Sequence, residues 1–332
     1  MLTRHCANKC GYCSYPHSEK RTLPSKKSLL AVIRQAIALG AVQVELIAGE
    51  GLDSIYAVSK NLRYFGYASF IDYLHDLLGY VECTNSNHPL FSLVNVGNLG
   101  FAELERLRPK LCAVQVMLES VDVEVQSSDA HRDAPCKVPE RRLETILQCG
   151  RLAIPVATGC MLGIGESEAS QVEALEIIAQ VHQRYGHIQS FEIQTFWPQP
   201  GTLMANHPAP SVDDLLTMIV MARDLLPMDI PIIVKAQEHP AIIKELLQAG
   251  VTDFGGISVR REDETDPSFW KATIERARIA CEEQGYQLHS RLPLHPAYYQ
   301  HQYYPSGYPG RLEQAHQYHR TPHPQALQAQ HP

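Results

Sequence analysis

Three cysteines lie close together near the start of the 332-residue chain. Cys6, Cys10 and Cys13 follow a Cys-x3-Cys-x2-Cys spacing, and an aromatic residue, Tyr12, precedes the third cysteine. Three soft thiolate ligands on one short loop suit an iron–sulfur cluster. With three protein ligands instead of four, one iron of a 4Fe-4S cluster keeps an open position for the amine and carboxylate of a cofactor. The spacing therefore predicts a catalytic cluster with these three residues as its metal ligands.

A zinc site is the alternative interpretation of the same cysteines. Zinc also accepts three cysteines and one histidine, and His5 or His17 is near enough in sequence to complete such a set. Zinc sites commonly combine two closely spaced ligand pairs, and no second pair appears near this one, so the cluster is favoured. The other six cysteines are scattered singly and are expected to be small buried side chains: Cys83, Cys112, Cys136, Cys149, Cys160 and Cys281.

Hydrophobic patterns predict the scaffold that positions these residues. Eight stretches have helical periodicity, at 24–39, 70–78, 101–107, 139–152, 167–185, 212–226, 240–249 and 268–284. Seven short apolar runs between them indicate buried parallel strands, at 42–48, 91–96, 112–118, 155–162, 188–196, 230–235 and 253–257. This alternation predicts an α/β fold, a (β/α)8 TIM-type barrel whose first strand is short or missing.

The cysteine loop should leave the carboxyl end of that first strand, on the barrel face where active sites are built. Only residues 1–5 precede Cys6, so little chain remains to form the strand. We expect the barrel domain to cover residues 1–296. From residue 297 the composition changes to Tyr, His, Gln and Pro without apolar periodicity, which predicts a disordered tail over 297–332.

Composition and charge limit the classes of partner. The formal net charge is -7, from 29 Lys and Arg against 36 Asp and Glu, which argues against a nucleic-acid-binding scaffold. The chain has no apolar run long enough to span a membrane and no signal-peptide core, so we expect a cytoplasmic protein. Its nine cysteines, an odd number, fit a reducing compartment better than a disulfide framework.

The cysteine spacing resembles that of the radical S-adenosylmethionine (radical SAM) superfamily, and the predicted barrel agrees with it. The resemblance implies that SAM occupies the open iron position. Gly49 and Glu50 follow a predicted strand in a segment similar to the superfamily's Gly-Gly-Glu motif, so Glu50 would bind the SAM ammonium. The other implied cofactor contacts are Tyr12 near the adenine, Glu119 toward the ribose or amino-acid part, and the glycines Gly163 and Gly165. A rim aromatic and a surface ion pair are the alternatives for Tyr12 and Glu119.

Longer segments are similar to the CofG family of deazaflavin synthases, in the same order across most of residues 6–299. They cover 117–120, 157–166, 187–194, 200–202, 246–258 and 288–296. This resemblance implies formation of 7,8-didemethyl-8-hydroxy-5-deazariboflavin (FO) by radical ring closure and ammonia loss. The substrate would be an adduct of the tyrosine p-hydroxybenzyl group with a ribitylaminouracil, made by a sister radical SAM enzyme. A reducing electron donor would serve the cluster.

Polar residues at the ends of later strands are candidates for binding this substrate. Asn95, Gln194 and Asp253 could hydrogen-bond the uracil or ribityl groups, or could equally be cap or loop residues. Two segments, 235–238 and 259–263, depart from the family pattern. They leave two other hypotheses open: a radical SAM paralogue with another small-molecule substrate, and a non-catalytic barrel stabilised by a metal.

Overall fold

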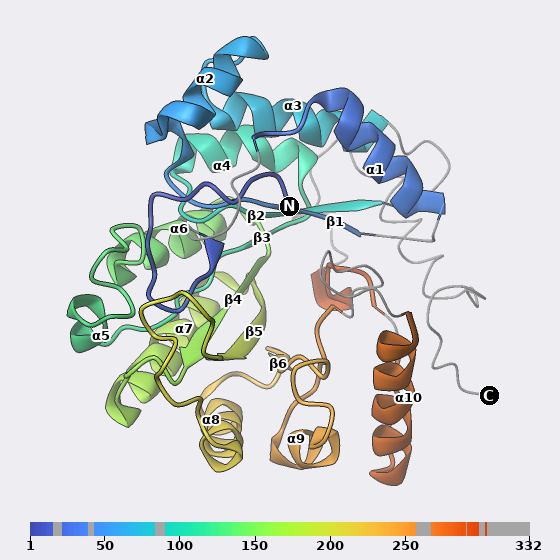
Figure 1. Ribbon diagram of the computed structural model, residues 1–332. Helices are drawn as coiled ribbons and strands as arrows, with labels where there is room; N and C mark the ends of the chain where they lie inside the picture. The colour runs from blue at the N-terminus through green and yellow to red at the C-terminus, as the bar shows by residue number, and fades with distance from the viewer. Residues whose placement is uncertain are drawn as a thin grey trace.

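A parallel sheet surrounded by helices forms the body of the protein (Figure 1). The computed structural model describes residues 1–15, 22–38, 43–83, 90–256, 267–289, 291–298 and 303. Six strands pair in sequential order: β1 (Gln43–Ile47), β2 (Phe91–Asn95), β3 (Ala113–Gln115), β4 (Val156–Leu162), β5 (Ile188–Thr195) and β6 (Ile232–Ile233). The α-helices of this part of the chain are α1 (Lys26–Ala38), α2 (Tyr56–Tyr64), α3 (Phe70–Cys83), α4 (Phe101–Leu107), α5 (Val123–Ser127), α6 (Pro139–Arg151), α7 (Glu168–Tyr185), α8 (Val212–Leu225), α9 (Ile243–Ala249) and α10 (Pro267–Glu283).

Single bridges continue the sheet at both edges. Thr3 pairs with Ala48 in parallel beside β1, and Asp253 pairs with Ile233 in parallel beside β6. These bridges stand where the first and last strands of an eight-stranded barrel would lie. The sheet order, the outer helices and these bridges confirm the expected barrel class with a short first strand.

The two faces of the sheet differ in polarity. Side chains that face the helices are apolar and buried, such as Leu46 and Phe191, and each contributes about 1.5–3 kcal/mol to stability. Because side chains alternate along a strand, every second residue faces inward. Several inward residues are polar and only half-buried: Glu45, Asn95, Gln115 and Gln194. The interior of such a barrel is usually filled by branched apolar side chains, so this polar inner face is unusual.

Most element boundaries agree with the sequence patterns. Helix α4 coincides with the predicted 101–107, and α6, α7 and α8 each match their predicted stretch to within a residue at either end. The predicted elements omit α2, although its buried Val58 and Leu62 lie on one face and Ile55 and Phe65 pack against the core at its two ends. They also omit α5, whose five residues are too few for a periodic pattern. Strand β6 is shorter than the predicted 230–235, since Pro231 has no N–H to donate. Of the predicted strand 253–257, Asp253 forms a bridge, and residue 257 lies outside the described residues.

The segment after residue 296 begins in contact with the barrel. Tyr298 is buried and its hydroxyl donates to the Ile188 carbonyl at 2.8 Å. The hydroxyl of Tyr303 donates to the Gly186 carbonyl at 3.0 Å, and its ring lies 4.9 Å from that of Tyr298. Apart from residue 303, the expected tail from residue 299 onward lies outside the described residues, so its disorder stays a prediction.

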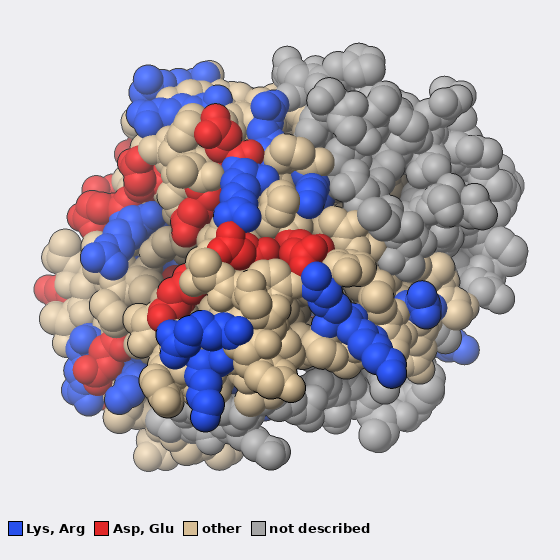
Figure 2. All heavy atoms as spheres, turned by 90° about the horizontal axis from the view of Figure 1, so that it is seen from above, with Lys and Arg blue, Asp and Glu red and all other residues tan. Residues whose placement is uncertain are grey.

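Acidic and basic side chains are interspersed on the face seen from above in Figure 2. Ion pairs such as Lys26 with Asp76 and Arg106 with Asp72 join helices in this region. Exposed pairs of this kind contribute little stability each. Separately, within the described ranges no helix combines the length and apolar character that crossing a membrane requires.

Candidate active site

The cysteine loop, residues 6–13, is anchored by backbone hydrogen bonds to two other segments. The Ala7 N–H donates to the Glu50 carbonyl at 2.8 Å, just beyond β1. The Lys9 N–H donates to the Asp133 carbonyl at 2.8 Å, in the segment between α5 and α6. All three cysteines are free thiols, with Cys10 buried and the other two half-buried. The loop therefore lies at the carboxyl end of the sheet, as its position in the sequence predicts.

The chemistry of the three thiols fits a cluster. Burial raises the pKa of Cys10 to about 12 and also raises the pKa of Cys13. Such a thiol becomes a thiolate ligand only beside a strong positive charge, which bound iron supplies. Among the described residues, no three His, Cys, Asp or Glu side chains are grouped closely enough to hold one metal ion. Cysteines that bind different irons of a cluster need no such grouping. His17, the alternative zinc ligand, lies outside the described residues.

Gly49 allows the cysteine loop to approach the end of β1. A Cβ atom at Gly49 would lie 2.1 Å from the carbonyl oxygen of His5 and 2.6 Å from the Cβ of Cys6. The next residue, Glu50, donates its N–H to the Cys6 sulfur at 3.3 Å. The segment Gly49–Glu50 therefore positions the Cys6 sulfur through a backbone N–H, and it also presents the Glu50 carboxylate.

We expect Gly49→Ala to lower the iron content of anaerobically reconstituted protein well below about four irons per chain. The added methyl group would displace the loop at His5 and Cys6, because the atoms that it meets belong mainly to backbone. Gly100→Ala is the matched control, since the atom nearest to a Cβ there is a side-chain oxygen of Glu103 at 3.6 Å. Iron content equal to that of Gly100→Ala would contradict this role of Gly49.

Four charged side chains form a buried cluster beside the cysteine loop: Glu50, Glu119, Lys137 and Arg142. Arg142 Nη2 donates to Glu50 Oε1. Lys137 Nζ lies 2.5 Å from Glu119 Oε1 and 3.7 Å from Glu50 Oε1. Glu119 follows β3 and Arg142 belongs to α6, so residues far apart in sequence meet here. We call these four residues the charge cluster.

Each carboxylate of the charge cluster keeps one oxygen without a partner. The Oε2 atoms of Glu50 and Glu119 are buried and accept no hydrogen bond from the residues that the structure describes. Leaving a buried polar atom unpaired is costly, so such an atom marks a place where a ligand can donate. An ammonium and a ribose hydroxyl are donors of the required kind. The charge cluster therefore fits the amino-acid and ribose parts of SAM.

Glu119 and Lys137 stay ionised at neutral pH. Burial works to raise the pKa of Glu119, but the Lys137 and Arg142 cations outweigh it and hold that pKa below its usual value. Burial works to lower the pKa of Lys137, but Glu119 and Glu50 outweigh it and raise that pKa. Glu119 also has φ 68°, in the left-handed region, which costs a non-glycine residue about 1–3 kcal/mol. This conformation occurs where the chain leaves β3, at a carboxylate of the charge cluster.

Tyr12 contacts a neutral histidine at the edge of the loop. Its hydroxyl lies 3.0 Å from His131 Nε2, and the two rings are 5.7 Å apart. Burial lowers the pKa of His131 to about 4 and raises the pKa of Tyr12 well above its usual value, so both groups are uncharged. Tyr12 is thus held in place beside Cys13, and its contact with adenine stays a prediction.

Gly163 and Gly165 form a tight turn after β4. Their φ angles are 92° and 101°, which favour glycine at both positions. The Glu166 carboxylate accepts hydrogen bonds from the N–H groups of Gly163 and Ile164, each at 2.8 Å. A Cβ at Gly163 would lie 2.7 Å from Pro210, whereas the space beside Gly165 holds no atom within 4 Å. Close approach of the cofactor to this turn stays a prediction.

The three residues predicted to bind substrate line different parts of the inner face. Asn95 at the end of β2 donates to the Glu45 carboxylate at 3.2 Å, and Gln194 on β5 donates to the Glu192 carboxylate at 3.2 Å. Asp253 pairs with Arg291 and lies 3.3 Å from His295 Nε2. Each of the three therefore has its own charged neighbour.

Three charged residues of the inner face and the charge cluster do not lie at predicted strand ends. Lys137 and Arg142 are in or near a helix, and Glu192 lies inside the predicted strand 188–196. Lys235 is different, because it is the last residue of the predicted strand 230–235 and begins the segment 235–238 that departs from the family pattern. The helical pattern indicates that Arg142 is buried, because Arg142 lies on the face of α6 that also carries the buried Thr145, Ile146 and Cys149. A charged residue on a buried helical face needs a partner. The sequence alone does not say which carboxylate that partner is.

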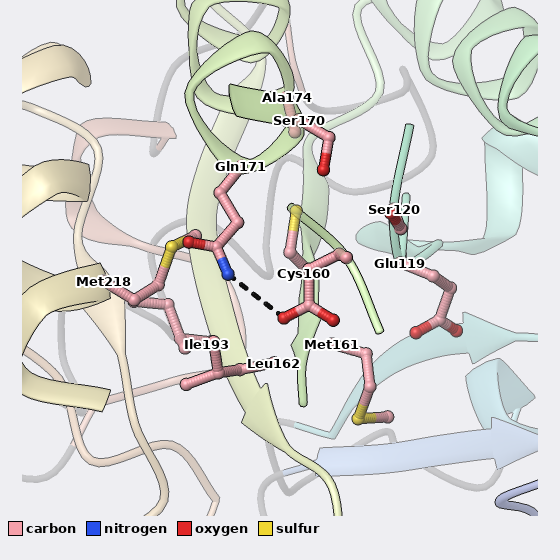
Figure 3. A pocket seen from close by; sticks show the side chains of 11 residues that line it. Glu119, Ser120, Cys160, Met161, Leu162, Ser170, Gln171, Ala174, Ile193 and Met218 are labelled. Carbon is pink, nitrogen blue, oxygen red and sulfur yellow. Dashed lines mark hydrogen bonds between the residues drawn. The ribbon is translucent and has the colours of Figure 1, made fainter. Parts of the chain in front are cut away.

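A small pocket lies on the helix side of β4 (Figure 3). Cys160 and Leu162 line it from the strand, and Gln171 and Met218 from α7 and α8. Gln171, which lines the pocket, donates to Glu166 at 3.1 Å. Most of the lining faces the helices, and the pocket shares Glu119 with the charge cluster.

The fold and this site define a radical SAM barrel, and comparisons with known proteins agree. A sequence model of the radical SAM superfamily matches residues 1–178. The solved structure of HydG, a maturase of the [FeFe]-hydrogenase, superposes with a TM-score of 0.67 at 16% identity, covering 86% of this chain and 64% of that one. Methylornithine synthase (PylB) gives a TM-score of 0.58 at 17% identity, covering 86% and 80%. These two likenesses concern the fold.

Comparisons of amino-acid sequence identify the family more narrowly than these likenesses of fold do. The 7,8-didemethyl-8-hydroxy-5-deazariboflavin synthase of Methanosarcina barkeri is 36% identical over 320 residues, 94% of each chain. The synthase of the same name from Methanocaldococcus jannaschii is 33% identical over 297 residues, covering 90% of this chain and 82% of the relative. The chain belongs to the radical SAM superfamily and, within it, to the family of these synthases. Its cofactors are a 4Fe-4S cluster and SAM.

Proposed function

We propose that this radical SAM enzyme forms FO from 5-amino-5-(4-hydroxybenzyl)-6-(D-ribitylimino)-5,6-dihydrouracil, by radical ring closure and loss of ammonia. It would then be a carbon–nitrogen lyase of deazaflavin coenzyme biosynthesis. The main support is the identity to named synthases along nearly the full length of both chains. The three cysteines beside a buried pair of carboxylates supply the site that such chemistry requires.

In this proposal the protein holds its cofactors with residues from the cysteine loop and the strand ends. Cys6, Cys10 and Cys13 bind the cluster. Glu50 accepts from the ammonium of SAM, and Glu119 accepts from its ribose or amino-acid part. When bound, SAM and the reduced cluster supply a 5'-deoxyadenosyl radical that removes hydrogen from the substrate. The protein orients these groups and excludes water from them.

Lys137 adds a positive charge to the same proposed site. Its ammonium stands between the two carboxylates of the charge cluster, and a SAM carboxylate approaching the cluster would meet it. Arg142 already donates a hydrogen bond to Glu50, and its side chain is buried. We therefore assign Lys137 to the cofactor and Arg142 to the positioning of Glu50.

The proposal keeps Asn95, Gln194 and Asp253 as contacts of the uracil or ribityl groups. Each already exchanges hydrogen bonds with a charged neighbour, which fixes its side chain before substrate binds. A sister radical SAM enzyme would supply the adduct, and a reducing protein would supply the electron.

Incubation without oxygen tests the proposal. With reductant, SAM and the adduct, the reconstituted protein is expected to release 5'-deoxyadenosine, ammonia and a fluorescent deazaflavin, identified by mass spectrometry. Release of 5'-deoxyadenosine with another small molecule, and no deazaflavin from the adduct, would instead establish the paralogue hypothesis. Reconstituted protein with one zinc and no iron would contradict the cluster itself.

A further inference from the structure

Three side chains donate toward one carboxylate on the inner face of the sheet. Glu192 on β5 receives Lys235 Nζ at 2.7 Å and Gln194 Nε2 at 3.2 Å on Oε1, and Gln115 Nε2 at 3.3 Å on Oε2. These groups come from β3, β5 and the residues just after β6. We call these four residues the inner polar group.

Two members of the inner polar group, Glu192 and Lys235, are charged although they are largely removed from water, and burying a charge costs free energy. Glu192 is only 6% exposed. Burial works to lower the pKa of Lys235, but Glu192 and Glu238 outweigh it and raise that pKa, so the ammonium persists. A buried ion pair of this kind is often no more stabilising than apolar residues of similar volume. The fold alone therefore gives no reason for it, since apolar side chains usually fill this layer of a barrel.

The inner polar group is also accessible from the inner face. Lys235 is 30% exposed at its side chain, and Gln115 and Gln194 are half-buried. Across the sheet, Glu45 on β1 and Asn95 on β2 add a further polar pair at 3.2 Å. Polar groups that converge on a partly open interior are typical of a small-molecule site.

The order of hydrogen-bonding groups points to one chemical partner. Lys235 donates to one oxygen of the Glu192 carboxylate and Gln115 donates to the other. The three side chains therefore present a donor (Lys235), an acceptor (Glu192) and a second donor (Gln115) in this order. A pyrimidinedione ring presents the complement along its imide edge, a carbonyl, an N–H and a second carbonyl. Charge-assisted bonds from Lys235 and to Glu192 are stronger than neutral ones.

We propose that Glu192, Lys235 and Gln115 recognise the imide edge of a pyrimidinedione substrate, with Glu192 accepting from the ring N–H and the other two donating to its carbonyls. This assignment rests on the proposed function for the identity of the substrate. It adds residues that set specificity, none of which lies at the cofactor-binding charge cluster.

Equilibrium binding without turnover tests this assignment. The probes are 5-amino-6-(D-ribitylamino)uracil and the same compound methylated on the imide nitrogen. Holoenzyme is expected to bind the methylated probe about 10- to 100-fold more weakly, because the methyl group removes the N–H and meets the Glu192 carboxylate. Lys235→Met is expected to weaken binding of the unmethylated probe by a similar factor while leaving the Kd for SAM unchanged.

Lys244→Met is the matched control, because Lys244 pairs with Glu283 on the outer surface at 3.7 Å and is 50% exposed. Gln115→Leu keeps the Glu192–Lys235 pair intact, so it tests the site even where Lys235→Met fails to fold. It should weaken binding of the unmethylated probe relative to Lys244→Met. Equal affinity of holoenzyme for the two probes, or no binding of either, would overturn the imide assignment.

The assay of the adduct keeps the two proposals distinct. Deazaflavin formation by Gln115→Leu and Lys235→Met with unchanged KM would sink the imide assignment and leave the synthase function standing. Absence of deazaflavin from the unmodified protein, together with the expected preference between the two probes, would sink the synthase function and support imide recognition.

Discussion

Replacing any one of Cys6, Cys10 or Cys13 by alanine is expected to abolish reductive cleavage of SAM. The cluster has only three protein ligands, so the loss of one leaves a second iron without a thiolate. The variants should release no 5'-deoxyadenosine above background. Their iron content should fall well below about four per chain, with loss of the visible absorbance of a thiolate-bound cluster.

Cys281→Ala is the control for this series. Cys281 is a free, buried cysteine on α10, outside the cysteine loop. Its replacement removes a thiol that is buried like Cys10 without touching the proposed cluster, so iron content and SAM cleavage should match the unmodified protein. Retained cleavage in any of the three loop variants would rule out the cluster as assigned.

Arg142→Met is expected to destabilise the folded protein by about 3–5 kcal/mol, the range found when one partner of a buried ion pair is removed. Arg142 is 2% exposed and donates to Glu50, so its loss leaves a buried carboxylate with only Lys137 nearby, at 3.7 Å. Methionine fills similar volume, which separates the charge effect from a cavity. Urea unfolding should show a lower midpoint with an unchanged slope.

Two further variants test whether the loss of stability comes from the buried Arg142–Glu50 pair. Arg278→Met removes an arginine that pairs with Glu275 and Glu282 on the exposed face of α10, and it should change the midpoint little because solvent screens such pairs. Arg142→Lys keeps the positive charge but loses the planar guanidinium group. Its urea midpoint should therefore lie between those of the unmodified protein and Arg142→Met. An Arg142→Met protein as stable as Arg278→Met would show that Glu50 does not depend on this arginine.

The same cluster links stability to cofactor binding. Glu50 and Glu119 each use one oxygen for a cation of the protein, and the other oxygen has no partner among the described residues. Lys137 and Arg142 hold the pKa of Glu119 below its usual value, although burial works to raise it. Loss of Arg142 is therefore expected to weaken SAM binding as well as folding, through the position of Glu50.

Much of the scaffold could be predicted from short-range patterns. The alternation of apolar runs with helical stretches located six strands and most helices, and α4 was predicted without error at either end. The cysteines 6–13 form one short motif, and the resemblance to the radical SAM superfamily links Gly49 and Glu50 to it, so no tertiary information was needed to group them. Helix α5 has too few residues for a periodic signal, whereas the short helix α2 was missed although Val58 and Leu62 are buried on one face of it.

The amino-acid sequence by itself determined the class of fold, the grouping of the three candidate cysteine ligands and the strand ends that face them. Only the tertiary structure decided how the charges pair. Glu50 meets Arg142 across 92 positions, and Gln115 meets Glu192 across 77. Local periodicity reports whether a side chain faces helices or the interior, since that depends on neighbours a few residues away. Which buried charge meets which partner depends on strand order and register, which exist only once the sheet has formed.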